Sequence, residues 1–231
     1  MKRLGLLGGM SWESSIEYER TINQLVRERL GGLASADLLI RSFNFADIEA
    51  LQTAGRWDDA GRVLADAARN LADGGADAIV ICTNTMHRLA EEVQAAVDIP
   101  LIHIADATAA AIKGSGVVVV ALLGTRYTME QAFYVGRLRE LHGLRVLVPD
   151  EPDRTVVHDV IYQELVRGIT SPQSKSQYLA IVERLVAQGA QGVIAGCTEI
   201  ELLIGPADLR VPMFPTAYLH AVAAVDFALA E

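Results

Sequence analysis

The two cysteines of this 231-residue chain lie at matching places in two separate segments. Cys82 occurs in the stretch IVICTNTMH and Cys197 in VIAGCTEI, and each follows a short apolar run and directly precedes a threonine. A thiol titrates near about pH 8.5, so it can give up or take a proton in neutral water. A helix N-terminus lowers the pKa of a thiol, and the glycine before Cys197 lets a ligand approach the backbone. The pattern indicates proton-transfer chemistry; the competing interpretation is a small buried apolar residue.

Short apolar runs alternate with longer segments of helical periodicity, which is typical of an α/β fold with mainly parallel strands. In the first half, strands are predicted over residues 3–7, 37–42 and 78–81, and helices over residues 11–30 and 58–72. The first of these helices has apolar residues at Trp12, Ile16, Ile22, Val26 and Leu30. Ligands bind at the carboxyl ends of parallel strands, and both cysteines fall at such ends.

Three blocks of the first half recur in the second half in the same order. GLLGGMS at 5–11 resembles ALLGTRYT at 121–128, an offset of 116, and the blocks ending in ICT at 63–83 and GCT at 178–198 are offset by 115. IPLIHIADATAAAI at 99–112 shares its strand-then-helix pattern with VPMFPTAYLHAVAA at 211–224, an offset of 112. Nearly constant offsets indicate a duplication. We therefore expect two similar pseudo-symmetric α/β domains, joined near Gly114–Gly116, whose equivalent loops face each other across one cleft.

The loops after the strands carry groups suited to a small polar ligand. Gly8 and Gly9 can expose backbone N–H groups at the start of a helix, which favours a carboxylate. No G-x-G-x-x-G motif for a dinucleotide is present. Asn84 and Thr85 can cap a helix, bind a ligand, or do both. In the second half Thr125 takes the place of Gly9.

Composition excludes several other classes of function. The net charge is −9 and no Lys/Arg cluster offsets it, which argues against nucleic acid as a partner. No apolar run is long enough to span a membrane, and none resembles the core of a secretory signal. Two cysteines without such a signal favour reduced thiols and a cytoplasmic location. The histidines do not have metal-ligand spacing, so no metal is expected.

Five stretches carry a resemblance to a known family: GLLGGMSWES, CTNTMH, IPLIHIADAT, LLGTRYTMEQ and GCTEIELL. Together they resemble the aspartate/glutamate racemase family, whose members racemise amino acids without a cofactor. The similarity extends over essentially the whole chain. It is greatest to the enterobacterial branch of broad-range and L-aspartate/glutamate-specific racemases.

The resemblance implies an isomerase that moves the α-proton of an amino acid between two acid/base groups, one from each domain. It implies that no cofactor is used, that pyridoxal phosphate is not needed, and that the protein is a homodimer. It also implies that the C-terminal helix returns to the first domain. The expected domains are therefore residues 1–98 plus 212–231, and residues 99–211.

The first catalytic motif of the family departs from its usual form in this chain. The family motif reads C-N-T-A-H, and here Thr83 stands in place of its cysteine. Cys82 lies one residue upstream, and adjacent strand residues point to opposite faces, so Cys82 should point into the domain. The internal repeat instead pairs Cys82 with Cys197. A threonine hydroxyl is a much poorer base than a thiol, so a water completes the relay at Thr83 or this face works slowly.

Family members selective for acidic substrates bind the side-chain carboxylate with an Arg and a Lys, and here Gln52 and Val166 occupy those positions. The substrate is thus aspartate or glutamate, or a neutral polar relative. The resemblance assigns catalysis to Thr83 and Cys197. It assigns substrate binding to Met10, Gln52, Asn84, Thr85, Thr125, Thr198 and Glu199. The alternatives are a hydantoin racemase, an arylmalonate decarboxylase, or an amino-acid-binding protein that has lost turnover.

Overall fold

A computed structural model describes residues 1–230 of the chain as two α/β units. Unit 1 comprises residues 1–104 together with the C-terminal stretch from His220, and unit 2 comprises Ala105–Leu219. Each unit has one four-stranded sheet in which every strand pair is parallel. This confirms the predicted fold class of two similar α/β domains.

The sheet of unit 1 has the order β2-β1-β3-β4. Its strands are β1 (Leu4–Gly8), β2 (Leu38–Ser42), β3 (Ala78–Ile81) and β4 (Leu101–Ile102). Side chains alternate between the two faces of a strand. Leu7 and Ile81 accordingly pack with α3 residues in one hydrophobic core. Because the strands are parallel, their carboxyl ends lie at one edge of the sheet, where the loops after β1 and β3 meet.

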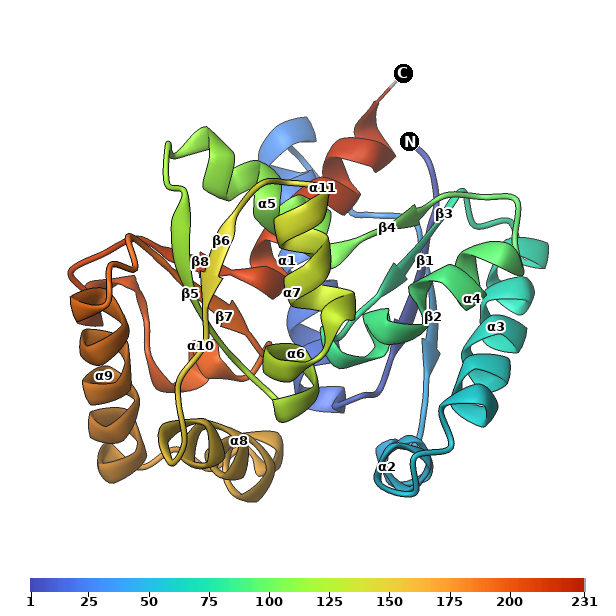
Figure 1. Ribbon diagram of the computed structural model, residues 1–231. Helices are drawn as coiled ribbons and strands as arrows, with labels where there is room; N and C mark the ends of the chain where they lie inside the picture. The colour runs from blue at the N-terminus through green and yellow to red at the C-terminus, as the bar shows by residue number, and fades with distance from the viewer. Residues whose placement is uncertain (231) are drawn as a thin grey trace. The chain divides into compact units, whose positions relative to one another are not determined.

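Helices cover this sheet, and Figure 1 shows α3 and α4 along one side of it. The helical segments of unit 1 are α1 (Trp12–Leu30), α2 (Phe45–Thr53), α3 (Trp57–Asp73), η1 (Thr85–Leu89), α4 (Ala90–Ala95) and the larger part of α11 (Thr216–Leu229). The predicted strands and helices of the first half are confirmed to within one residue at each end.

The buried face of α1 includes only two of the apolar residues that mark this helix in the sequence, Ile22 and Val26. Its buried residues are Ser14, Tyr18, Ile22, Leu25 and Val26, whereas Trp12, Ile16 and Leu30 are half or more exposed. The spacing of the buried set gives a narrow stripe centred on Tyr18 and Ile22. Tyr18 joins this stripe because its hydroxyl has a partner inside the unit, so an amphipathic side chain takes a core position.

Unit 2 repeats the topology with the sheet order β6-β5-β7-β8. Its strands are β5 (Val119–Gly124), β6 (Arg145–Leu147), β7 (Val193–Gly196) and β8 (Met213–Pro215). The helical segments are α5 (Ile104–Gly114, all but its first residue), α6 (Arg126–Glu130), α7 (Ala132–Glu140), α8 (Asp153–Gln163), η2 (Leu165–Arg167), α9 (Pro172–Ala187), α10 (Ile200–Leu203) and η3 (Pro206–Asp208). β5 and β7 each start 115 residues after β1 and β3, the offset of the sequence repeat.

Both unit boundaries lie further along the chain than expected. The expected boundaries followed residues 98 and 211, whereas the observed ones follow Ile104 and Leu219. β4 pairs with β3, so residues 99–102 belong to the sheet of unit 1. β8 pairs with β7 and holds residues 213–215 in unit 2. The Gly114–Gly116 stretch is not a junction, because it lies at the end of α5 inside unit 2.

One buried side chain of unit 1 makes its stability depend on pH. His220 is fully buried, and burial lowers its pKa from 6.5 to about 4. Between these values the unfolded chain binds the proton and the folded chain does not. The free energy of unfolding should therefore fall by about 3 kcal/mol as the pH is lowered from 6.5 to 4. Denaturant unfolding at a series of pH values measures this slope. His220→Gln should remove this contribution, and an unchanged slope in the variant would contradict the assignment.

Within residues 1–230, no helix combines the length and the apolar character needed to cross a membrane.

Candidate active site

The loop after β1 is tightly built. Gly9 has φ +82°, and a Cβ there would lie 2.3 Å from the Phe43 carbonyl oxygen, so the position requires glycine. The Gly9 N–H donates to Ser15 Oγ at 2.7 Å. Ser11 caps α1 by accepting from the Ser14 N–H. The Gly9 N–H therefore already has a partner inside the loop, which corrects the prediction that it is exposed for a carboxylate.

Cys82 and Thr83, which follow β3, lie in different surroundings. Cys82 is 1% exposed, its Sγ lies 3.8 Å from the Val80 carbonyl oxygen, and burial raises the pKa of its thiol. Thr83 is partly exposed, while Asn84 and Thr85 are buried at the start of η1. Solvent can therefore reach the hydroxyl at position 83 more easily than the thiol at position 82.

Two of the predicted substrate contacts in unit 1 have packing partners inside that unit. Met10 is 4% exposed and belongs to the hydrophobic core that also contains Met86. Gln52, on α2, is 5% exposed, and its Nε2 donates to the Met86 Sδ at 2.9 Å. Both residues therefore support the region around Met86, whose backbone follows Thr85 in η1.

The carboxyl ends of β5 and β7 approach closely in unit 2. Gly124 pairs with Gly196, and a Cβ on Gly124 would lie 2.9 Å from the Gly196 carbonyl oxygen. The residues that follow, Thr125 and Cys197, are thereby brought to neighbouring positions at this edge. Thr125 is buried, and its Oγ1 accepts from the Thr128 N–H at 3.3 Å as the N-cap of α6. A small residue at each strand end thus brings a hydroxyl and a thiol to the same edge.

Cys197 and Glu199 form a buried hydrogen-bonded pair. The thiol Sγ donates to Glu199 Oε2 at 2.9 Å, and the Thr198 hydroxyl donates to the same oxygen at 2.8 Å. Cys197 is 7% and Glu199 3% exposed. One carboxylate oxygen therefore accepts hydrogen bonds from two neighbouring side chains. A thiol bound in this way can pass its proton to the carboxylate over one short hydrogen bond.

This pair overturns the prediction of a lowered thiol pKa. Burial, and secondly the charge and hydrogen bond of the Glu199 carboxylate, raise the pKa of Cys197 well above its usual value. Hydrogen bonds from the loop backbone oppose the shift without reversing it. The helix that follows, α10, has only four residues, which is too few to offset these effects by its dipole. Cys197 is thus a protonated thiol at neutral pH in this structure.

A further buried group, Tyr178 on α9, is not indicated by any of the sequence motifs. It is fully buried, and its hydroxyl donates to the Val157 carbonyl oxygen at 2.8 Å. Burial, followed by the negative charge that Cys197 carries in its thiolate form and the charge of the Glu164 carboxylate, raises the pKa of Tyr178 well above 10.0. Tyr178 therefore presents a neutral phenol in the electrostatic environment of Cys197. Nothing in the local sequence pattern indicates this, because the two residues come from different elements.

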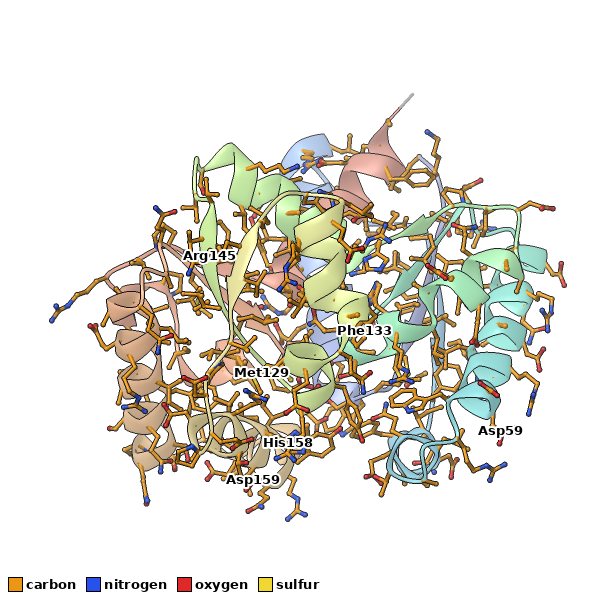
Figure 2. All side chains as sticks on the ribbon, in the orientation of Figure 1. Asp59, Met129, Phe133, Arg145, His158 and Asp159 are labelled. Carbon is orange, nitrogen blue, oxygen red and sulfur yellow. The ribbon has the colours of Figure 1, made fainter. Side chains whose placement is uncertain are left out.

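The start of α6 is tied to α8. His158 on α8, labelled in Figure 2, accepts the Arg126 N–H at its Nδ1 at 3.2 Å. The Arg126 guanidinium donates to Thr155 Oγ1 at 3.1 Å. Burial, and secondly the positive charge of Arg126, lower the pKa of His158. These contacts hold the loop that carries Thr125 against α8.

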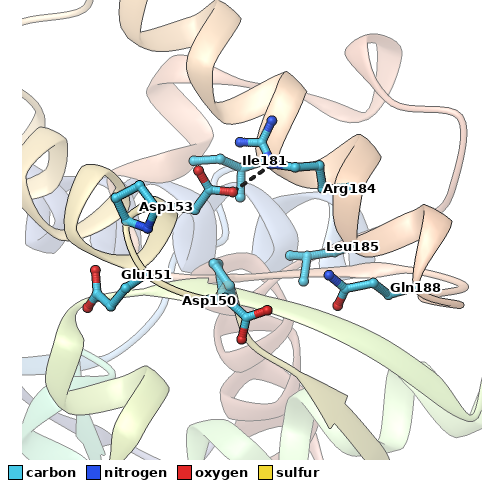
Figure 3. A pocket seen from close by; sticks show the side chains of 9 residues that line it. Asp150, Glu151, Asp153, Ile181, Arg184, Leu185 and Gln188 are labelled. Atoms are coloured by element: carbon cyan, nitrogen blue, oxygen red, sulfur yellow. Dashed lines mark hydrogen bonds and ion pairs between the residues drawn. The ribbon is translucent and has the colours of Figure 1, made fainter.

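Two pockets of unit 2 lie apart from these residues. The one in Figure 3, of about 300 Å³, is lined by residues that include Asp150, Asp153 and Arg184, and the last two form an ion pair at 2.7 Å. The second, of about 520 Å³, lies beside Val135 and Val146. Neither contains Thr125, Cys197, Thr198 or Glu199. Among residues 1–230, no three His, Cys, Asp or Glu side chains are grouped to bind a metal ion.

Comparison with known proteins identifies the family. Residues 7–224 match the family model described as Asp/Glu/Hydantoin racemase. The chain belongs to the Asp/Glu/hydantoin racemase family. This confirms the resemblance inferred from the motifs, and it makes the protein an isomerase of the racemase type.

Individual relatives of this racemase agree with that assignment. The broad specificity amino-acid racemase RacX of Bacillus subtilis (strain 168) is 26% identical over 176 residues, covering 75% of this chain and 74% of RacX. A crystal structure of a candidate Asp/Glu racemase from Yersinia pestis has 53% identity and a TM-score of 0.94, and that of an aspartate racemase homologue from Pyrococcus horikoshii OT3 has 33% and 0.87. Both cover 100% of each chain.

The Glu199 carboxylate of this racemase should control the acidity of Cys197. Because Glu199 raises the pKa of the thiol, Glu199→Gln should lower that pKa, although burial should still keep it above that of an exposed thiol. The measurement is the pH dependence of alkylation at Cys197 by iodoacetamide, read by mass spectrometry. The midpoint should move to lower pH in Glu199→Gln. Cys82 serves as an internal control, because burial and not a carboxylate raises the pKa of its thiol. The midpoint of alkylation at Cys82 should therefore be the same in both proteins. A midpoint that stays in place or rises would contradict the prediction.

Proposed function

We propose that the protein is an amino-acid racemase that acts without a cofactor, with Cys197 as one acid/base group and Thr83 as the other. The observation that carries the proposal is the buried hydrogen bond from the Cys197 thiol to the Glu199 carboxylate at the carboxyl edge of a parallel sheet. A proton acceptor is thereby already in place for the thiol. Membership of the racemase family supports the reaction class.

In the proposed reaction, the Cys197 proton first moves to Glu199, which leaves a thiolate. The thiolate removes the α-proton of the substrate, and the Cα–H electron pair is delocalised into the carboxylate. Thr83 donates its hydroxyl proton to the opposite face of Cα, and the proton that Glu199 took from Cys197 returns through water to the Thr83 oxygen, so Glu199 and Thr83 regain their starting forms while Cys197 keeps the α-proton. Racemisation requires groups on opposite faces of Cα, so the proposal requires Thr83 and Cys197 to act on the same substrate. In the reverse direction, water must help Thr83 accept the proton, because a hydroxyl is a weak base.

The remaining polar residues of the two loop edges are proposed to bind the amino acid. Asn84, Thr85, Thr125 and Thr198 follow the central strands of the two sheets. Their hydroxyl and amide groups can donate to the α-carboxylate or accept from the amine. The positive charge of the substrate ammonium would also affect the acidity of Cys197. Placed near Glu199, it would offset the carboxylate charge that keeps the thiol protonated.

The lysines support a reaction without pyridoxal phosphate, which would need a lysine to form its Schiff base. The chain has three: Lys2 precedes β1, Lys113 lies in the last turn of α5, and Lys175 lies on α9 in an ion pair with Asp208. None follows the carboxyl end of a strand. The acid/base groups proposed at these ends are the chain's own side chains.

A panel of substrates tests the proposed function. Purified protein is incubated with single enantiomers of aspartate, glutamate and neutral polar amino acids, and chiral chromatography follows the other enantiomer. Because Gln52 and Val166 replace the cationic pair of acid-selective members, we expect neutral polar substrates among those converted. Conversion of a 5-substituted hydantoin or an arylmalonate alone would favour those reactions, and binding without conversion of any compound would indicate a binding protein. The homodimer and the cytoplasmic location stay predictions.

A further inference from the structure

A cluster of three buried histidines lies inside unit 1, next to the loop that carries Thr83. His87, His103 and His220 are 2%, 9% and 0% exposed. The His87 ring centroid lies 4.6 Å from that of His103 and 5.5 Å from that of His220. Three titratable rings in one core need a structural or functional explanation, because burial of a charged imidazole is costly.

The hydrogen bonds of His87 determine which of its nitrogens carries the proton. Its Nε2 accepts the Ile104 backbone N–H at 3.1 Å, so this nitrogen has no hydrogen of its own. Its Nδ1 lies 2.7 Å from the Thr83 carbonyl oxygen, which can only accept. The ring is therefore neutral, with the proton on Nδ1, and it donates to the backbone of the proposed catalytic residue. Both ring nitrogens are used.

His87 therefore joins two backbone groups that are far apart in the sequence. Ile104 is the first residue of α5, and the first N–H groups of a helix have no partner within the helix. The Thr83 carbonyl lies two residues beyond the end of β3, where the ladder of the sheet has ended. A single side chain thus satisfies both groups and holds the Thr83 loop against the β4–α5 junction.

His220 holds the same junction from the other side. His220 donates from Nε2 to the Ile102 carbonyl oxygen at 2.6 Å, and its Nδ1 accepts from the Tyr18 hydroxyl at 2.9 Å. Ile102 ends β4, two residues before Ile104. His220 thus uses both ring nitrogens to anchor β4 to α11 and α1, and neither nitrogen bonds the Thr83 loop, which makes His220 a matched comparison for His87.

We propose that His87 is a positioning residue: its Nδ1–H donor fixes the Thr83 backbone, and through it the hydroxyl that faces the substrate. The inference rests on the proposed function for its effect on turnover, whereas the hydrogen bond itself can be tested without activity. Misplacement of a reacting group by about 1 Å can cost up to about a hundredfold in rate. Loss of this bond should therefore lower kcat with little change in KM.

Two amide variants separate the two bonds of His87. In His87→Asn the side-chain amide can still donate near the Nδ1 position, while the acceptor for the Ile104 N–H is lost. In His87→Gln the amide reaches the Nε2 position and can accept from Ile104, while the donor to Thr83 is lost. We expect kcat per folded molecule to fall at least about tenfold in His87→Gln and to stay within about threefold of wild type in His87→Asn. His220→Gln should lose stability but keep kcat.

Two readouts do not depend on turnover. In ¹⁵N NMR of wild type, the His87 ring should carry its proton on Nδ1 at neutral pH. Hydrogen–deuterium exchange of the 82–87 segment should increase in His87→Gln and not in His220→Gln. A proton on Nε2, unchanged exchange in His87→Gln, or a kcat of His87→Gln equal to that of wild type would overturn the inference. If wild type racemises no amino acid, the proposed function fails, and the NMR and exchange results still decide whether His87 holds the loop.

Discussion

Replacing Cys197 with serine should reduce racemisation at least about a hundredfold, a loss of about 3 kcal/mol in transition-state stabilisation. The serine hydroxyl fits the space and can still donate to Glu199, so the fold and the buried hydrogen bond should persist. A hydroxyl is far less acidic than a thiol, however, and it cannot supply an anion to remove the α-proton. The measurement is kcat for each enantiomer of the best substrate, with circular dichroism to confirm folding.

Cys82→Ala is the matched control for this substitution. Cys82 is as buried as Cys197 and follows the equivalent strand, but its Sγ lies 3.8 Å from the Val80 carbonyl oxygen, and burial rather than a carboxylate raises the pKa of its thiol. The variant should lose about 1 kcal/mol of stability and keep its turnover per folded molecule. A folded Cys82→Ala as inactive as Cys197→Ser would show that the repeat, which pairs the two cysteines, gives the correct catalytic register. Retention of more than about a tenth of the wild-type kcat in Cys197→Ser would remove Cys197 from the mechanism.

Replacing Thr83 with cysteine should raise kcat at least about tenfold in the slower direction. Wild type should turn over faster from the enantiomer whose α-proton faces Cys197, because the Thr83 hydroxyl donates a proton readily but accepts one poorly. The two enantiomers have equal free energy in water, so kcat/KM must be equal in both directions. The difference in kcat must therefore be matched by a difference in KM. A thiol at position 83 supplies a base on the second face and should bring the two kcat values together.

Thr83→Ser provides the comparison, because it keeps the hydroxyl and should behave like wild type. Initial rates from each pure enantiomer, measured for wild type and both variants, decide the matter. Equal kcat values in the two wild-type directions would contradict the account of Thr83 as the weaker base. So would a folded Thr83→Cys variant that is slower in both directions.

Much of the fold could be predicted because its signals are local and repeated. The buried runs of β1 and β3 are short and apolar, and the helices between them have strong periodicity or clear glycine ends, so their bounds followed from pattern alone. The unit boundaries could not be predicted in this way. They depend on which sheet the very short β4 and β8 join, and strand pairing is a long-range property.

In the candidate site, too, local features could be predicted and long-range contacts could not. The motifs located both strand-end loops, but the acidity of Cys197 was predicted in the wrong direction. A local rule for helix N-termini does not include burial, or a Glu199 side chain that turns back toward the thiol. The hydrogen-bond partners of His87 could not be predicted from the local pattern. Its bond to Ile104 joins residues 17 apart, and the contact of His220 with Ile102 joins residues 118 apart.

Deuterium labelling from a pure enantiomer in D₂O tests most directly whether two side chains move the α-proton on opposite faces. Samples are taken at low conversion, the enantiomers are separated, and mass spectrometry reads deuterium at Cα in each. The account predicts deuterium in the newly formed enantiomer and almost none in the remaining substrate, from either starting enantiomer. Deuterium that enters the remaining substrate as fast as product forms would mean that one group serves both faces. The absence of Cα exchange from every amino acid that is bound would contradict racemase activity itself.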